Sequence, residues 1–265
     1  MEDSFNNRLL KRCNQSNNRL CIGLDIDPDK LPSQISDLSS VEAFTKDIID
    51  STINFCPVYK PNFAFYERFG SKGFALLENI VAHIDDRAIT IADAKRGDIG
   101  NTSKHYADSI FNQFGFDAIT ISPYMGSDAI TPFIENQNKG VFVLCLTSNS
   151  SAKDFQFITE NNNQLYEIVA DKTESLNKNN NLGLVVGATN KEQMLSLREK
   201  NPSLSWLIPG IGAQGGDLET SVKVGNQNGI GLVNISRSII YAGDGSIDEI
   251  SKSALNYTEQ IRSFL

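Results

Sequence analysis

Two aspartates and a lysine follow the apolar run that begins at Thr90, in the spacing Asp93-x-Lys95-x-x-Asp98. Side chains alternate between the faces of a strand, so Asp93 and Lys95 are expected to point the same way. Asp and Lys are rarely buried unless paired, so this cluster is either an ion pair at a strand end or a reactive site. A lysine held there could stabilise a developing anion and protonate it.

A second group of residues is suited to binding a phosphate. The glycine-rich segment Pro209–Asp217, which contains Gln214, follows one apolar run, and Arg237 follows the next. Glycines alone fit an ordinary turn, but exposed backbone N–H groups can also bind an anion, and a guanidinium forms a fork that matches phosphate. The sequence therefore predicts a ligand with a phosphate at one end and its reacting group at the other.

Alternating strands and helices must position these residues. Short apolar runs recur, each followed by a polar loop and an amphipathic segment, which is typical of a parallel sheet with covering helices. We predict eight strands, at 20–25, 57–60, from 90 onward, and at 118–121, 140–146, 182–186, 205–208 and 231–235. Eight such units favour an α/β fold of the (β/α)8 TIM-barrel type. The alternative, an open doubly wound sheet, would usually show a glycine-rich turn after its first strand, where Asp25-Ile26-Asp27-Pro28 stands.

Polar residues collect where these strands end, which is the edge at which TIM barrels place their active sites. They are Asp25, Lys60, Asp93, Lys95, Asp98, Ser148, Gln214 and Arg237. Any one of them could be a solvated strand end or a turn residue, but stability alone does not explain the whole set. The polar segment 147–163 is long for a plain connection and is a candidate binding element. We also expect a helix to begin with a capping box over Ser39–Glu42.

The composition argues against several classes of protein. The chain has 265 residues and a net charge of −8, which disfavours binding to nucleic acid or to a membrane surface. No apolar run approaches the roughly 20 residues that span a bilayer, and segment 1–18 lacks the apolar core of a signal peptide, so we expect a cytoplasmic protein. The four cysteines and two histidines show no metal-ligand spacing, and no metal site is predicted.

The segment Asp93–Thr102, with the sequence D-A-K-R-G-D-I-G-N-T, resembles the signature of the orotidine 5′-phosphate decarboxylases. Lys60, the Pro209–Asp217 segment and Ser236-Arg237-Ser238-Ile239 match further parts of that family, and segment 146–149 is similar to its longer bacterial branch. The resemblance covers nearly the whole chain. It implies a single TIM-barrel decarboxylase domain over residues 1–265.

The resemblance also implies catalytic roles. Lys95 would protonate C6 of the pyrimidine, and Asp93 would lie against the substrate carboxylate. Lys60 would join this chain of charges. The counterparts of Asp98, Ile99 and Thr102 reach into the active site of the neighbouring subunit in this family, so the resemblance implies a homodimer.

The remaining residues would bind the substrate. Asp25 and Lys60 would contact ribose hydroxyls, and Ser148 would contact the pyrimidine. The phosphate end would be held by Pro209, Gln214, Ser236 and Arg237. The family often has glycine immediately before this arginine, but Ser236 keeps the backbone N–H that a phosphate would contact.

The implied reaction is decarboxylation of orotidine 5′-monophosphate to uridine 5′-monophosphate and CO2, in de novo pyrimidine biosynthesis. The sequence contains no evident cofactor motif, so the carbanion formed at C6 would be stabilised electrostatically by the protein. Two alternatives stay open. A metal-dependent sugar-phosphate decarboxylase or synthase of the same barrel type would share the D-x-K-x-x-D strand, and a non-catalytic barrel could bind the nucleotide without turning it over.

Overall fold

A closed parallel barrel organises the chain, and a computed structural model describes residues 4–31, 33, 35, 37–212 and 215–265. Pairing of Leu20 with Val233 joins the first strand to the last and closes the sheet. The TIM-barrel prediction is therefore confirmed, and the open doubly wound sheet is wrong. The barrel strands are β1 (Leu20–Gly23), β2 (Val58–Lys60), β3 (Ile89–Arg96), β4 (Ala118–Ile121), β5 (Gly140–Leu146), β8 (Leu182–Val186), β9 (Ser205–Ile208) and β10 (Gly231–Ile235).

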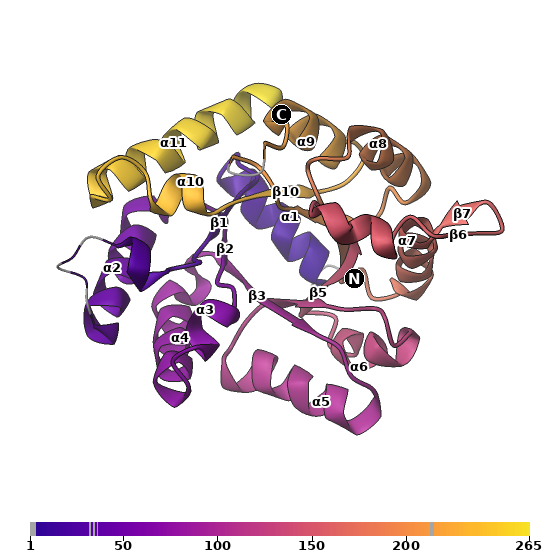
Figure 1. The fold of residues 1–265 in the computed structure, drawn as a ribbon, viewed down its shortest axis with the longest axis horizontal. Coiled ribbons are helices and arrows are strands. Elements are labelled where there is room, and N and C mark those ends of the chain that lie inside the picture. Colours follow the sequence, from indigo (N-terminus) through magenta and orange to yellow (C-terminus); the bar gives the residue numbers. More distant parts are fainter. Residues whose placement is uncertain (1–3, 32, 34, 36, 213–214) are drawn as a thin grey trace.

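Helices surround the barrel (Figure 1). Their inner faces are apolar at helical spacing, and these faces pack on the outer faces of the strands in one large core. The covering helices are α2 (Leu38–Thr52), α4 (Ser71–Ile84), α5 (Gly100–Asp108), α6 (Thr131–Ile134), α7 (Leu165–Leu176), α8 (Lys191–Lys200), α9 (Leu218–Gly225) and α11 (Ile247–Phe264). Two single-turn helices, α3 (Ala64–Glu67) and α10 (Arg237–Ile240), precede α4 and α11.

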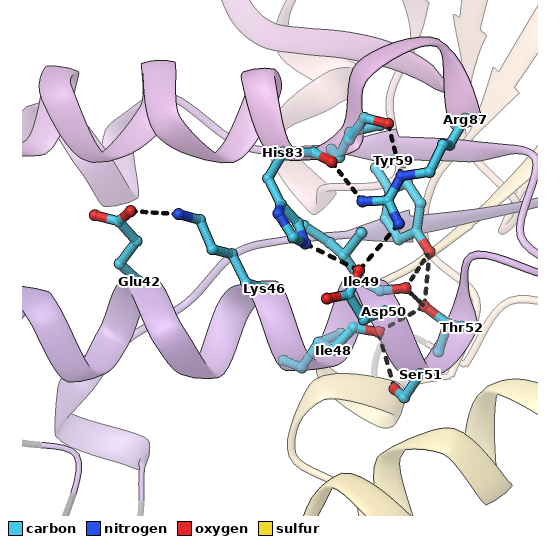
Figure 2. Close-up of polar contacts among 11 residues, drawn as sticks. Glu42, Lys46, Ile48, Ile49, Asp50, Ser51, Thr52, Tyr59, His83 and Arg87 are labelled. Carbon is cyan, nitrogen blue, oxygen red and sulfur yellow. Dashed lines mark hydrogen bonds and ion pairs between the residues drawn. The ribbon is translucent and has the colours of Figure 1, made fainter.

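The start of α2 differs from the prediction. Asp37 is the N-cap, its carboxylate accepts the backbone N–H of Ser40 at 2.7 Å, and Ser40 completes the capping box. Ser39 lies inside the helix, because Asp37 supplies a stronger acceptor two residues earlier. Glu42, expected to close the box, instead accepts a hydrogen bond from Lys46 at 2.7 Å (Figure 2).

Polar contacts connect α2 to α4 and to the turn after α4 on the outside of the barrel, as Figure 2 shows. His83 Nε2 lies 2.9 Å from Asp50 Oδ1, and Arg87 Nη1 donates to the same oxygen at 3.1 Å. Deeper in the same region the hydroxyl groups of Tyr59 and Thr52 are 2.7 Å apart, which links β2 to α2. These contacts fix the helices that follow the first two strands.

Helix α1 (Phe5–Gln15), which is absent from the predicted elements, lies across the centre of the barrel in Figure 1. Its buried side chains Phe5, Leu9 and Cys13 pack against the inward-facing residues of the strands. The Phe5 ring meets the Phe142 ring edge-on at 6.1 Å. The Asn6 side chain donates to the carbonyl of Leu182 and accepts from the Ser205 hydroxyl. Helix α1 therefore closes the end of the barrel where the strands begin.

The polar segment after β5 has local structure of its own. It contains a short 3₁₀ helix, Ser150–Asp154, and a small antiparallel hairpin made of β6 (Thr159–Glu160) and β7 (Asn163–Gln164). The hairpin projects from the body of the protein beside α7 (Figure 1). The start of this segment, directly after β5, lines a cavity, whereas its tip is the exposed hairpin turn.

All four cysteines are free thiols in the interior, where an unpaired cysteine behaves as a small hydrophobe. Burial raises the pKa of the Cys13 and Cys56 thiols to about 12. Among the residues that the structure describes, no helix is long and apolar enough to cross a membrane.

Replacing Phe5 tests whether α1 is an integral part of the core. Phe5 is 1% exposed, and its ring occupies the space directly above Gly140, so Phe5→Ala should lower the free energy of unfolding by about 3–5 kcal/mol. Leu10→Ala is the matched control on the same helix, because Leu10 is 40% exposed and should cost less than about 1 kcal/mol. Equal urea midpoints for the two variants would contradict this role of α1.

Candidate active site

Asp93 is the centre of a hydrogen-bonded cluster at the C-terminal end of β3. Its Oδ2 accepts from Lys60 Nζ at 2.7 Å, and its Oδ1 accepts from Lys95 Nζ at 2.5 Å. The hydroxyl of Thr120, on the neighbouring strand β4, donates to the same Oδ1 at 3.0 Å. The structure thus brings together the lysines from β2 and β3 on one carboxylate.

Asp93 and Lys95 meet for a reason that differs from the predicted one. Regular pairing of β3 with β4 stops after Ala92, which pairs with Ile119. The next pair is Arg96 with Ile121, so β3 uses four residues where β4 uses two. The chain is therefore bulged between these points, and Lys95 has a left-handed backbone with φ of 46°. The side chains converge as expected, but a β-bulge rather than a regular strand produces this arrangement.

Burial and neighbouring charges set the protonation of this cluster. Burial alone would raise the pKa of Asp93, but the charges of Lys60 and Lys95 dominate and hold it well below its usual range. Burial would likewise lower the pKa of Lys60, yet Asp93 and Asp25 raise it above its ordinary value. Lys60 is only 3% exposed, and the small accessible part of its side chain lines the cavity at the end of the barrel.

Asp25 lies after β1, next to this cluster. The Tyr241 hydroxyl fixes the loop, because it donates to the Asp25 carbonyl at 2.9 Å and accepts from the Asp27 backbone N–H at 2.7 Å. The Asp25 Oδ1 and Ser236 Oγ atoms are buried and make no hydrogen bond within the described part of the chain. Both therefore have unused hydrogen-bonding capacity at the cavity wall, which a bound hydroxyl or other polar group could satisfy.

A cavity of about 530 Å³ connects the Asp93 cluster with the ends of the other strands. Pro209 follows β9, which is opposite β3 in the barrel order, and Ser236 and Arg237 follow β10. Leu144, Val185 and Leu207 form the apolar part of the wall. The cavity thus has a charged end, an apolar wall and a separate cationic group.

Close backbone contacts position two of these cavity residues. A Cβ atom on Gly23 would lie 2.7 Å from Cβ of Ser236, so glycine allows β1 and the start of α10 to approach. A Cβ atom on Gly187 would lie 2.8 Å from the backbone nitrogen of Ser148. A side chain at either glycine would therefore push Ser148 or Ser236 away from its present position.

Most of the predicted site residues line this one cavity: Asp25, Lys60, Asp93, Lys95, Ser148, Pro209, Ser236 and Arg237. Asp98, Ile99 and Thr102 do not line it; Ile99 and Thr102 are exposed, and the Asp98 carboxylate accepts the Ile99 N–H at 2.8 Å. Gln214 lies outside the described residues. In the described part of the chain, no group of three or more His, Cys, Asp or Glu side chains could hold a metal.

Sequence reasoning missed Thr120 and Asn234, which also line the cavity. Thr120 lies in a run typical of a buried strand, so its type gave no signal. Asn234 did offer one, because an amide is unusual within an apolar strand such as 231–235. The closed barrel shows that both residues line the cavity and that Thr120 contacts Asp93.

Comparison with known proteins identifies relatives of this chain. Residues 18–247 match the family model described as "Orotidine 5'-phosphate decarboxylase / HUMPS family". A Dehalococcoides mccartyi protein named orotidine 5′-phosphate decarboxylase is 47% identical, with 96% of each chain covered.

The chain belongs to the orotidine 5′-phosphate decarboxylase family. A Christiangramia forsetii member of the same name is 46% identical over 86% of this chain and 85% of its own. The solved structure of Leishmania donovani OMP decarboxylase superposes with a TM-score of 0.87 at 36% identity, with 98% of each chain covered. The decarboxylase fold therefore extends over the whole barrel, including its N-terminal helix.

The buried charge pairing generates a pH prediction. Asp93→Asn leaves Lys60 without its nearest counter-charge and should lower the free energy of unfolding near pH 7 by about 3 kcal/mol. Because the folded pKa of Asp93 is depressed, its contribution is complete above its unfolded pKa of about 3.9 and is lost as pH falls through the folded value. Urea unfolding should therefore show a smaller difference from wild type near pH 3 than near pH 7.

Asp50→Asn is the matched control, because Asp50 is half-exposed in its pairs with His83 and Arg87. Its cost should stay below about 1 kcal/mol. A difference between wild type and Asp93→Asn that grows as the solution is acidified would contradict the assigned charge state.

Proposed function

We propose that this chain decarboxylates orotidine 5′-monophosphate to uridine 5′-monophosphate and CO2 in de novo pyrimidine biosynthesis, as a single cytoplasmic barrel domain and without a cofactor. Membership of the decarboxylase family supports the reaction. The observation that carries the mechanism is the buried Asp93 carboxylate, which is bonded to Lys60 on one oxygen and to Lys95 on the other.

Lys95 is the proton donor. Breaking the bond from C6 to the carboxylate leaves the electron pair on C6 and releases CO2. The Lys95 ammonium stabilises this pair and then transfers one N–H proton to C6, and solvent afterwards reprotonates the amine. Lys95 is suited to this role because its side chain lines the cavity and is half-exposed, whereas the Lys60 side chain is almost fully buried.

Asp93 faces the substrate carboxylate in this mechanism. Its negative charge repels that carboxylate in the bound substrate, and the repulsion ends when CO2 leaves. The two lysines keep Asp93 ionised despite its burial. Lys60 and Asp25 bind the ribose hydroxyls, and the unpaired Oδ1 of Asp25 supports this assignment.

The rest of the cavity binds the pyrimidine and the phosphate. Ser148 contacts the ring, while the phosphate is bound by residues from the ends of β9 and β10: Pro209, Gln214, Ser236 and Arg237. The position of Pro209 across the barrel from Asp93 supports this division. Binding energy gained at the phosphate can then be used to hold the ring against the charged cluster.

Asp98, Ile99 and Thr102 complete the active site of the partner in a homodimer. Their position outside this chain's own cavity supports the assignment, as does the apolar surface around them. Ile99 and Tyr106 are exposed, and the exposed Tyr124 and Met125 follow the segment that packs on Gly97. Apolar surface of this kind is typical of an interface.

The reaction is tested by following orotidine 5′-monophosphate turnover by ultraviolet absorbance with chelator-treated protein. We expect rapid conversion to uridine 5′-monophosphate. Activity only on a sugar phosphate with added Mg²⁺ would instead assign the chain to the metal-dependent relatives. Tight nucleotide binding with neither reaction would indicate a binding protein.

Two variants separate chemistry from binding in the same assay. Lys95→Ala should lower kcat by at least about 10⁴-fold while uridine 5′-monophosphate binding stays within about tenfold, because it removes the proton donor and leaves the phosphate end intact. Arg237→Ala should raise KM by about 10- to 100-fold through loss of a charge-assisted bond. Near-normal turnover by Lys95→Ala, or unchanged affinity in Arg237→Ala, would refute the corresponding role.

The shared site predicts complementation between inactive variants. Lys95→Ala and Asp98→Ala should each be inactive alone, whereas an equal mixture that exchanges subunits should regain about a quarter of the wild-type activity, because each mixed dimer has one intact site. Sedimentation confirms that the mixture is dimeric. No recovery after demonstrated exchange would place Asp98 in its own subunit's site.

A further inference from the structure

Thr120 faces the bulge in β3 that produces the active-site geometry. Strand β4 advances by two residues, from Ile119 to Ile121, while β3 advances by four, from Ala92 to Arg96. Thr120 is the residue of β4 that spans this difference. We propose that Thr120 is a positioning residue of the decarboxylase, whose hydroxyl fixes the Asp93 carboxylate and the Lys95 backbone relative to each other.

The first contact of the hydroxyl is with the backbone. The Lys95 N–H donates to Thr120 Oγ1 at 3.0 Å, in a region where the bulge has removed the regular pairing of β3 with β4. Lys95 also has a positive φ of 46°, which a residue with a Cβ adopts only when its surroundings hold it there. The Thr120 hydroxyl supplies such a restraint at the residue that donates the proton.

The second contact is with the carboxylate. The Thr120 hydroxyl uses its only proton to donate to Asp93 Oδ1 at 3.0 Å, the same oxygen that Lys95 Nζ contacts. Lys60 donates to the other oxygen, Oδ2. Donors on both oxygens therefore fix the rotation of the Asp93 carboxylate about χ2. One hydroxyl therefore determines the direction of Asp93 and the backbone of Lys95 together.

The type and burial of residue 120 fit this role. Thr120 is 1% exposed, and a β-branched side chain on a strand has few accessible χ1 rotamers, so the hydroxyl is held in one direction. Valine has nearly the same shape but would leave the Lys95 N–H without this acceptor and Asp93 without this donor. Serine would keep both hydrogen bonds.

This inference rests on the proposed decarboxylation, so the wild-type turnover is measured first. Thr120→Val should lower kcat by about 10- to 100-fold, as expected for losing a hydrogen bond to a charged group. KM and the Kd for uridine 5′-monophosphate should stay within about threefold, because the phosphate end is unchanged. Thr120→Ser should restore kcat to within about threefold of wild type.

Thr90→Val is the matched control. Thr90 is equally buried, accepts the Asp117 backbone N–H at 3.1 Å and donates to Asp117 Oδ2 at 3.2 Å, but it lies at the opposite end of the barrel from the cavity. Loss of the Thr90 hydroxyl should lower the free energy of unfolding and leave kcat unchanged.

The outcomes separate the possibilities. A wild-type kcat in Thr120→Val, equal kcat losses in Thr120→Val and Thr90→Val, or a Thr120→Ser variant as slow as Thr120→Val would each overturn the positioning role. If Thr120→Val does not fold, Thr120→Ala removes the same hydroxyl and is judged by the same criteria. An inactive wild-type protein would instead refute the proposed function itself.

Discussion

The Asp93 carboxylate is the buried charge on which the arrangement of the site depends. Removing an ionised carboxylate from water is unfavourable unless donors replace the water, and Lys60, Lys95 and Thr120 supply them from three adjacent strands. The three donors reach one carboxylate because β2, β3 and β4 are neighbours in the barrel. The strand order is therefore a condition for this site. The barrel therefore stabilises the charged form that the proposed reaction uses.

The Asp93 cluster combines a buried ammonium with an irregular strand. Lys60 is nearly fully buried, and its ammonium is stable there only because carboxylates lie close by. The bulge that brings Lys95 onto Asp93 interrupts regular pairing of β3 with β4 at the end of the barrel that opens into the cavity. Helix α1 fills the other end of the barrel with close apolar packing, so the barrel interior is apolar at one end and charged at the other.

The barrel could be predicted from the sequence because each strand is marked by an apolar run within a few neighbouring residues. Apolar runs and their spacing identified all eight strands, and the residues after them identified most of the cavity. It did not predict α1, since Phe5, Leu9 and Cys13 form a narrow apolar stripe in a polar segment. Strand alternation correctly predicted that the side chains of Asp93 and Lys95 meet, but a β-bulge rather than a regular strand brings them together. The role of Thr120 depends on its register against the bulge, which no pattern within β4 encodes.

The burial of the four thiols has a practical consequence. Burial keeps Cys13 and Cys56 in the protonated, unreactive form, and Cys21 and Cys145 are enclosed in the same way. The native chain thus offers maleimide dyes little to react with. A cysteine introduced at Asn161, in the exposed turn of the β6–β7 hairpin, would give one labelling position on the loop beside the cavity. A fluorophore there could follow movement of that loop during turnover without first removing the natural cysteines.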